Sequence, residues 1–182
     1  MNRWRTPYYR CSTWLYGPSR RSTPLSWIYT ERIAIGTLPT VKTLKAERVT
    51  HIVNCRATAQ TWLSQDLAIE RALLGPSKVV HAPMWDSGGH QSPHLWSTAA
   101  HFAAEVLGTD PEARILIHCH QGRRRSVMLA YAVLRLRGHS PDGARTLITK
   151  HRTEAYIVDA YTTCVEQWLA NGAKPVGLLR IR

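Results

Sequence analysis

Residues 115–126 read I-L-I-H-C-H-Q-G-R-R-R-S. The stretch starts as an apolar run of strand length, continues as a short loop with one glycine and three consecutive arginines, and enters a helix predicted over 126–137. In such a unit the backbone N–H groups of the loop and of the first helical turn point at one spot, where the helix dipole adds positive potential. The stretch therefore predicts a strand of a sheet, a helix beside it, and a binding site for a phosphate-sized anion.

Two side chains of this loop carry reactive chemistry. Cys119 lies where the loop donors converge, and a thiol beside a helix N-terminus and cations loses its proton more easily. Arg125, six residues later, has a planar guanidinium group that can bind two oxygens of one phosphoryl group. Gly122 between them permits a tight backbone path. The segment therefore combines a nucleophile with an anion-binding loop.

Short apolar runs alternate with helical stretches on both sides of this loop. Strands that alternate with helices favour a largely parallel sheet covered on both faces. We therefore predict the α/β class, with a central, mostly parallel sheet of four to five strands flanked by helices. The predicted strands cover 27–30, 32–35, 49–54, 78–82 and 114–118. The predicted helices cover about 40–48, 59–74, 94–107, 126–137, a segment that starts at 141, and 158–170.

The composition limits the class of protein. A chain of 182 residues fits one domain of ordinary size, and 44% apolar residues exclude a wholly disordered chain. The 24 Lys and Arg against 12 Asp and Glu give a net charge of +12, which attracts phosphate esters, nucleic acid or acidic membranes without choosing among them. The four cysteines form no C-x-x-C pair, and the longest apolar run, 127–134, is too short to span a bilayer. A reduced cytoplasmic protein without a membrane span is the resulting expectation.

The chain divides into three predicted parts. Residues 1–26 contain five Arg, three Pro and five aromatic residues but no acidic residue, which indicates a basic, aromatic-rich arm. This arm is either an extension that packs on the body or an anion-contacting segment whose arginines hold phosphates while its aromatics stack on bases. Residues 27–172 form the predicted catalytic domain. Residues 173–182 form a basic C-terminal tail.

The loop matches the pattern H-C-x-x-G-x-x-R-S at every specified position. With the segment R-I-A-I-G-T-L-P-T at 32–40, it resembles the cysteine-dependent protein tyrosine phosphatase superfamily, specifically its small dual-specificity phosphatases, over about residues 27–170. The resemblance implies hydrolysis of phosphate monoesters on tyrosine, serine and threonine through a cysteinyl-phosphate intermediate, without a metal or another cofactor.

By position, the resemblance makes Cys119 the nucleophile, Arg125 the phosphate clamp and Ser126 the hydroxyl that stabilises the departing thiolate. His118 would be a buried neighbour that orients the loop. A metal site on residues 118–120 is disfavoured, because adjacent residues of a strand point to opposite faces and do not easily converge on one ion. The predicted phosphate-binding loop comprises His118, His120, Gln121, Gly122, Arg123, Arg124 and Arg125.

The reaction also needs a proton donor for the leaving group and a base for water, and one carboxylic acid can do both. Asp86 follows the predicted strand 78–82 and stands 33 residues before Cys119, so both lie beyond the carboxyl ends of parallel strands. The family has a mobile acid-bearing loop at about this separation, so the resemblance gives Asp86 the role of general acid. If Asp86 only forms a turn, Asp66 and Asp110 are the replacements.

Three positions leave alternatives open. Arg124 stands where many relatives have serine, and together with Arg123 it either indicates a heavily anionic substrate or points to solvent. Cys55, directly after the strand 49–54, is either a buried structural thiol or a resolving thiol that forms a disulfide with Cys119.

Three functions remain open at this point. The first is a phosphatase for phosphorylated proteins or other phosphomonoesters. The second is an RNA 5′-phosphatase or a phosphoinositide phosphatase with the same mechanism. The third is a non-catalytic binder of phosphorylated ligands or nucleic acid that uses the same loop, with the arm 1–26 as an added nucleic-acid contact. The sequence does not define the oligomeric state.

Overall fold

The computed structural model describes residues 25–177, and within this range the chain forms a single five-stranded sheet with the strand order β1-β2-β5-β3-β4. β1 pairs with β2 in antiparallel orientation, whereas the other neighbouring pairs are parallel. The predicted α/β class with a mostly parallel sheet is therefore confirmed. The strands are β1 (Leu25–Ile28), β2 (Ile33–Gly36), β3 (His51–Asn54), β4 (Val79–His81) and β5 (Ile115–His118).

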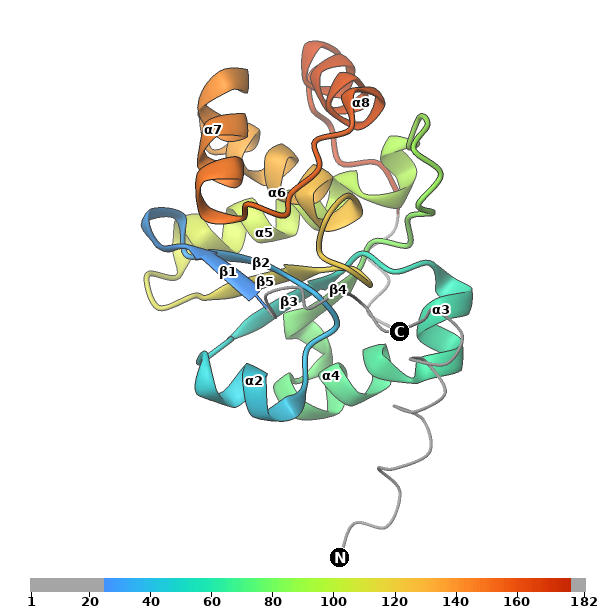
Figure 1. Cartoon of the computed structure of the whole chain (residues 1–182), viewed down its shortest axis with the longest axis vertical. Helices are drawn as coiled ribbons and strands as arrows, with labels where there is room; N and C mark the ends of the chain where they lie inside the picture. Colours follow the sequence, from blue (N-terminus) through green and yellow to red (C-terminus); the bar gives the residue numbers. More distant parts are fainter. Residues whose placement is uncertain (1–24, 178–182) are drawn as a thin grey trace, which may run out of the picture.

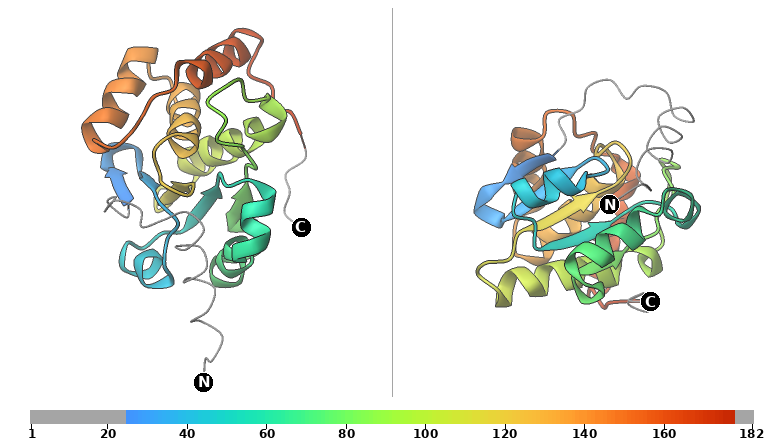
Figure 2. Two further views of the ribbon diagram at one scale, coloured as in Figure 1. Left: turned by 45° about the vertical axis from the view of Figure 1, so that its right-hand side comes forward. Right: turned by 90° about the horizontal axis from the view of Figure 1, so that it is seen from below.

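Helices cover both faces of the sheet (Figure 1; Figure 2). One face carries the three helices that precede β4 along the chain, and the other carries the four later ones. On the first face lie α2 (Val41–Ala46), α3 (Thr58–Ser64) and α4 (Asp66–Leu74). On the second face lie α5 (Ser97–Thr109), α6 (Arg125–Leu136), α7 (Pro141–His151) and α8 (Asp159–Ala170).

Two apolar cores follow from this layering. All four residues of β2, of β3 and of β5 are buried, as expected for parallel strands between two layers of helices. The larger core lies under α5, α6 and α8, where ten consecutive residues of α6, from 125 to 134, are buried. The smaller core joins the sheet to Leu44 of α2 and to leucines of α4. Helix α6 is therefore held on several sides, and its N-terminus has a fixed position.

The predicted helix over 59–74 is wrong in one respect, because the structure has two helices there. Gln65 adopts a left-handed backbone conformation with φ of 55°, which ends α3 and lets α4 begin at Asp66. The Asp66 side chain then turns inward and accepts a hydrogen bond from Arg56. The helix predicted over 94–107 also differs slightly, since a 3-10 turn at Pro93–Leu95 precedes α5.

The ends of the predicted domain contact the body beyond its predicted limits. β1 begins at Leu25, and Ser26 accepts a hydrogen bond from Arg152 at 3.2 Å. At the other end, the backbone carbonyls of Val176 and Gly177 accept hydrogen bonds from Thr98 at 3.1 Å each. Residues 1–24 of the predicted arm and 178–182 of the predicted tail lie outside the described residues.

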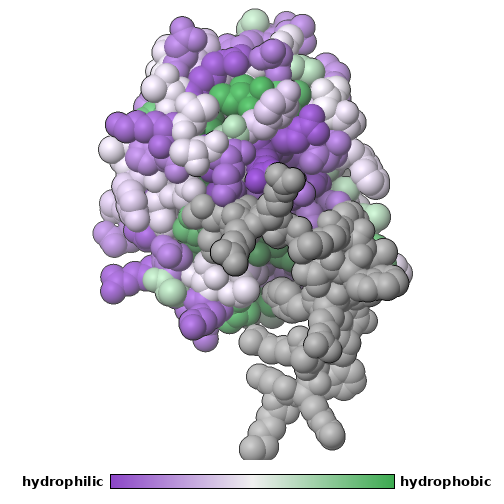
Figure 3. Space-filling model, viewed as in Figure 1, coloured by the Kyte–Doolittle hydropathy of each residue, from purple (hydrophilic) through white to green (hydrophobic). Residues whose placement is uncertain are grey.

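The described surface is mostly polar. On the face seen in Figure 3, hydrophobic residues occur in small separate patches between larger hydrophilic areas. Large exposed apolar side chains include Trp62, Leu63, Trp85 and Tyr156. Between residues 25 and 177, no helix combines the length and the apolar character needed to cross a bilayer.

We expect Leu129→Ala to lower the free energy of unfolding by about 2–5 kcal/mol, because it leaves a cavity beneath α6. Leu129 is completely buried in the larger core. Leu63→Ala is the matched control, because Leu63 is 56% exposed in α3 and its loss should change stability by less than about 0.5 kcal/mol. Urea unfolding of both variants tests this, and equal effects would contradict the packing described.

Candidate active site

The candidate site lies at the carboxyl edge of the parallel strands. The loop of residues 119–124 joins β5 to α6, and the segment 82–92 that holds Asp86 follows β4. Because β3, β4 and β5 run parallel, both segments emerge at the same edge of the sheet. Asp86 and Cys119 are thus brought to one place, although 33 residues separate them in the sequence.

The Cys119 sulfur is surrounded by hydrogen-bond donors. The backbone N–H of Gly122 donates to Sγ at 3.2 Å, and the Ser126 hydroxyl lies 3.4 Å from it. Burial alone raises the pKa of this thiol, but the charge of Arg125 and the hydrogen bonds from Ser126 and Gly122 outweigh it, so the pKa is lowered. The surroundings therefore favour the thiolate, which is the nucleophilic form of cysteine.

The guanidinium group of Arg125 is fixed along one edge. Its Nη1 donates to the Gln60 side chain at 2.9 Å, to the Met84 carbonyl at 3.2 Å and, more weakly, to the Cys55 carbonyl at 3.5 Å. Its Nε makes no hydrogen bond to any described residue, and it lies 3.8 Å from a carboxylate oxygen of Asp86. Arg125 thus has one fixed edge, while its Nε side faces the acid-bearing segment.

A close backbone contact shapes the loop. Gly122 has a φ of 66°, and a Cβ atom there would lie 2.5 Å from the backbone carbonyl of Gly36 at the end of β2. Arg152, which is buried, donates hydrogen bonds to the carbonyls of Gly122, of Gln121 and of Ile35. Only glycine therefore fits position 122, and Arg152 fastens the loop to β2.

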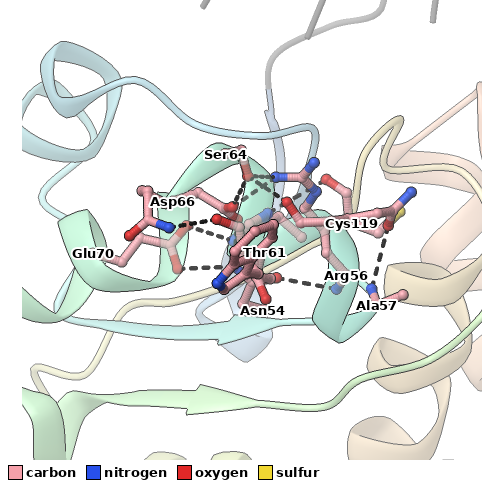
Figure 4. A network of polar contacts seen from close by, with 12 residues as sticks. Asn54, Arg56, Ala57, Thr61, Ser64, Asp66, Glu70 and Cys119 are labelled. Atoms are coloured by element: carbon pink, nitrogen blue, oxygen red, sulfur yellow. Dashed lines mark hydrogen bonds and ion pairs between the residues drawn. The ribbon is translucent and has the colours of Figure 1, made fainter. Parts of the chain in front are cut away.

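A network of buried charges lies beside the loop (Figure 4). His118 is fully buried and forms an ion pair with Glu70 of α4 at 2.9 Å. Burial lowers the pKa of His118, but the charge and the hydrogen bond of Glu70 outweigh it and raise the pKa. Asn54 links Glu70 to Asp66, and Asp66 is also paired with Arg56 at 2.7 Å. This network anchors the start of the loop.

The three carboxylates considered from the sequence as general acids lie in different places. Asp66 is buried, and both of its oxygens are occupied, one by Arg56 and the other by Asn54. Asp110 directly follows α5 and precedes β5, so it lies at the opposite edge of the sheet from Cys119. Of the three, Asp86 is the carboxylate that contacts arginines of the β5–α6 segment.

Asp86 contacts two arginines of the β5–α6 segment. Its Oδ1 lies 3.2 Å from Arg124 Nη1, and its Oδ2 lies 3.8 Å from Arg125 Nε. The segment around it is anchored on α8, where the Tyr161 hydroxyl accepts the backbone N–H of Gly88 at 3.1 Å. The Asp86 carboxylate is therefore held over the loop, and its side chain remains 39% exposed.

Gln91 anchors the same segment from its far end. Its side chain donates to the Trp85 carbonyl at 2.9 Å, and its backbone N–H donates to the Cys164 sulfur at 3.3 Å. The residues beside Asp86 are thus tied down on both sides.

The remaining predicted loop residues take different positions. Burial, together with the charges of Arg56 and Arg125, lowers the pKa of His120. The backbone carbonyl of Arg123 accepts a hydrogen bond from the N–H of Tyr156 at 2.8 Å, and the guanidinium group of Arg124 lies 5.5 Å from the ring centre of the same tyrosine. Arg124 therefore lies between the acid-bearing segment and Tyr156.

Cys55 is fully buried directly after β3. The pKa of the Cys55 thiol is raised well above its usual range, mainly by burial and to a smaller extent by the nearby Cys119. The charge of Arg125 acts in the opposite direction but does not outweigh them. Among residues 25–177, no group of three or more His, Cys, Asp or Glu side chains has an arrangement suited to a metal ion.

Several supporting residues of the site were missed from the sequence. They come from distant segments: Gln60 from α3, Glu70 from α4, and Arg152, directly after α7. Tyr161 and Gln91, which hold the Asp86 segment, were also missed. No local pattern marks any of them, because each acts through a contact with a remote part of the chain.

The fold is shared with solved phosphatase structures, although the sequence matches no family model and no curated protein sequence. PTPMT1 in complex with PI(5)P is similar with a TM-score of 0.64 and 17% identity, over 76% of this chain and 90% of that chain. Human DUSP28 has a TM-score of 0.64 and 16% identity, over 84% and 97%. A mouse putative dual specificity phosphatase complexed with zinc tungstate has a TM-score of 0.63 and 20% identity, over 87% and 98%.

These similarities define the class of fold. The chain shares its fold with solved dual-specificity phosphatase structures. The resemblance expected from the loop motif is thereby confirmed at the level of the fold.

We expect Cys119 to be alkylated at a lower pH than an ordinary thiol, because its pKa is lowered and the thiolate is the reacting form. Mass spectrometry measures the rate of iodoacetamide labelling at Cys119 as a function of pH. This rate should reach half its maximum at a pH below about 8.5, the pKa of an ordinary cysteine thiol. In Arg125→Ala the midpoint should move to higher pH.

Cys55 is the internal control for this experiment. Its raised pKa predicts no labelling over the same pH range. A Cys119 midpoint equal to that of free cysteine would contradict the electrostatics described.

Proposed function

We propose that this protein is a phosphatase that hydrolyses phosphate monoesters through a cysteinyl-phosphate intermediate. One observation carries the proposal: the backbone N–H of Gly122 and the hydroxyl of Ser126 both lie within hydrogen-bond distance of the Cys119 sulfur, and the charge of Arg125 lowers the pKa of this thiol. An arrangement that stabilises one negative sulfur also suits the equatorial oxygens of a phosphoryl group, because both need convergent N–H donors and positive charge.

In the first step of the proposed reaction, the Cys119 thiolate attacks phosphorus, and the bond between phosphorus and the ester oxygen breaks. The new bond is between sulfur and phosphorus, and the electron pair of the broken bond goes to the leaving oxygen. Asp86, in its protonated form, transfers its proton to that oxygen. Arg125 and the loop amides bind the phosphoryl oxygens while this charge moves.

In the second step, water attacks the cysteinyl phosphate. The Asp86 carboxylate accepts a proton from this water, and the bond between sulfur and phosphorus breaks. The Ser126 hydroxyl, 3.4 Å from the sulfur, donates a hydrogen bond to the departing thiolate. Inorganic phosphate leaves, and the enzyme returns to its starting protonation states.

The proposed substrates are phosphorylated proteins, with phosphotyrosine, phosphoserine and phosphothreonine all reachable. Two exposed aromatic residues support a peptide or another ring-bearing group near the site: Trp85, next to Asp86, and Tyr156, beside Arg124. A phosphoinositide is the second candidate, because the arginine-rich loop suits a polyanionic headgroup and PTPMT1, a structural neighbour, was solved with PI(5)P. An RNA 5′-phosphatase, a nucleic-acid role of the arm and a cytoplasmic location stay predictions.

A variant pair tests the mechanism. We expect Cys119→Ser to abolish turnover of an aryl phosphate while it still binds a phosphate analogue such as tungstate, because the loop donors remain. Asp86→Ala should lower the rate by about 100- to 10,000-fold, the usual contribution of a general acid. Steady-state kinetics and calorimetric titration measure the two effects. Full turnover by Cys119→Ser would refute the proposed mechanism, and binding without any turnover by the wild-type protein would favour the non-catalytic reading.

A comparison of substrates tests the proposed specificity. We expect a phosphotyrosine peptide to have a higher kcat/KM than a phosphoinositide or a triphosphorylated RNA, measured by phosphate release at one salt concentration. A preference for the lipid or for the RNA would replace the protein substrate with that class and leave the mechanism intact. Cys119→Ser, measured in parallel, identifies phosphate release from a contaminating enzyme.

A further inference from the structure

Arg124 contacts the segment 82–92, which carries Asp86. Its Nη1 lies 3.2 Å from Asp86 Oδ1, and a Cβ atom at Gly88 would lie only 2.9 Å from its Nη2. The ring of Tyr156 lies 5.5 Å from its guanidinium carbon. Arg124 thus contacts the segment that carries the candidate general acid on one side and the 152–158 connection on the other.

Arg124 and Arg125 differ in their exposure and in their contacts with Asp86. Arg125 is 3% exposed and is tied to backbone carbonyls and to Gln60, and its weak contact with Asp86 involves Nε, which donates no hydrogen bond to any described residue. As the proposed phosphate clamp, Arg125 would offer this nitrogen to a bound phosphoryl group. A bound phosphoryl group would compete with Asp86 for this nitrogen. Arg124 is 35% exposed and makes the shorter contact with Asp86. The contact with Arg124 is therefore the one that Asp86 can keep when substrate enters.

The surroundings of Asp86 make this ion pair effective for orientation. An exposed ion pair usually contributes little to stability, since ordering two long side chains opposes it. Here the backbone beside Asp86 is already anchored, because Tyr161 binds Gly88 and Gln91 binds the Trp85 carbonyl. The pair then needs to fix only the direction of one short side chain.

We propose that Arg124 is a positioning residue for the general acid: its guanidinium group contacts Asp86 and holds the carboxyl group over the loop before substrate binds. When Asp86 is protonated, its carbonyl oxygen can still accept a hydrogen bond from Arg124. The inference rests on the proposed phosphatase function. The competing roles of Arg124 are direct binding of the substrate phosphate and simple solvent exposure, and the test below separates all three.

The test uses two aryl phosphates that differ in their need for a proton. Phenyl phosphate has a poor leaving group and depends strongly on the general acid, whereas 4-nitrophenyl phosphate has a good one and depends on it little. We expect Arg124→Gln to lower kcat/KM on phenyl phosphate about tenfold more than on 4-nitrophenyl phosphate, a part of the roughly 100- to 10,000-fold that a general acid supplies. The comparison uses kcat/KM because it reports the first step, whereas kcat also includes hydrolysis of the cysteinyl phosphate, which is the same for both substrates.

Arg123→Gln is the matched control, because it removes one positive charge from the same loop and Arg123 has no ion pair with a carboxylate within residues 25–177. Its effect on kcat/KM should be the same factor for both substrates. In the Asp86→Ala background, Arg124→Gln should cause no further loss of kcat/KM on phenyl phosphate, because the group that it positions is gone. Equal urea midpoints of the single variants and the wild type exclude a difference in folding.

Two results would overturn the inference. Equal losses of kcat/KM on both substrates would make Arg124 a phosphate ligand, and unchanged kinetics would make it a solvent-exposed residue. Cys119→Ser, assayed beside these variants, distinguishes failure of the proposed function from failure of the proposed role of Arg124. If Cys119→Ser retains turnover, the proposed function fails. If it is inactive and Arg124→Gln does not discriminate between the substrates, only the role of Arg124 fails.

Discussion

A buried thiol whose pKa is lowered by its surroundings is the constraint on which the rest of this structure depends. Cys119 is 2% exposed, and burial of this kind disfavours an anion. The loop offsets this with an amide from Gly122, a hydroxyl from Ser126 and the charge of Arg125. Gly122 presents its amide only because it adopts a positive φ against Gly36. The ionisation of one atom thus requires the end of β2, the loop and the start of α6 to be placed together.

Charges are balanced in two layers around this sulfur. On the buried side, His118 with Glu70 and Arg56 with Asp66 form pairs in which each charge has a partner. Buried pairs of this kind contribute little net stability, but loss of one partner leaves an uncompensated charge, so they suit the task of holding a loop in one shape. On the solvent side, Asp86 faces the arginines of the loop. The first layer is rigid, whereas the second is exposed enough to respond to a ligand.

The parts of the site that the sequence predicted are those encoded in one continuous stretch. The strand, loop and helix at 115–126 follow from local periodicity, and the parallel sheet follows from alternating apolar runs and helical stretches. Arg152, Gln60 and Glu70 escaped prediction because each reaches the loop from another element. The break at Gln65 also escaped, since neither glycine nor proline marks it and a left-handed glutamine is set by tertiary contacts. Asp86 was found through its spacing from Cys119, but its arginine partners are visible only in three dimensions.

The hydrogen bond from Arg152 to the Ile35 carbonyl joins positions 117 residues apart, and the same guanidinium group binds the carbonyl of Gly122. Contacts of such long range form only after most of the chain has been ordered, because closing a large loop costs entropy before it brings any gain. During synthesis, residue 152 leaves the ribosome after the whole loop and α6 have already emerged. In the nascent chain, Cys119 therefore lies in an unshaped loop without the contacts that lower its pKa, and the proposed activity begins only when nearly the entire domain has assembled.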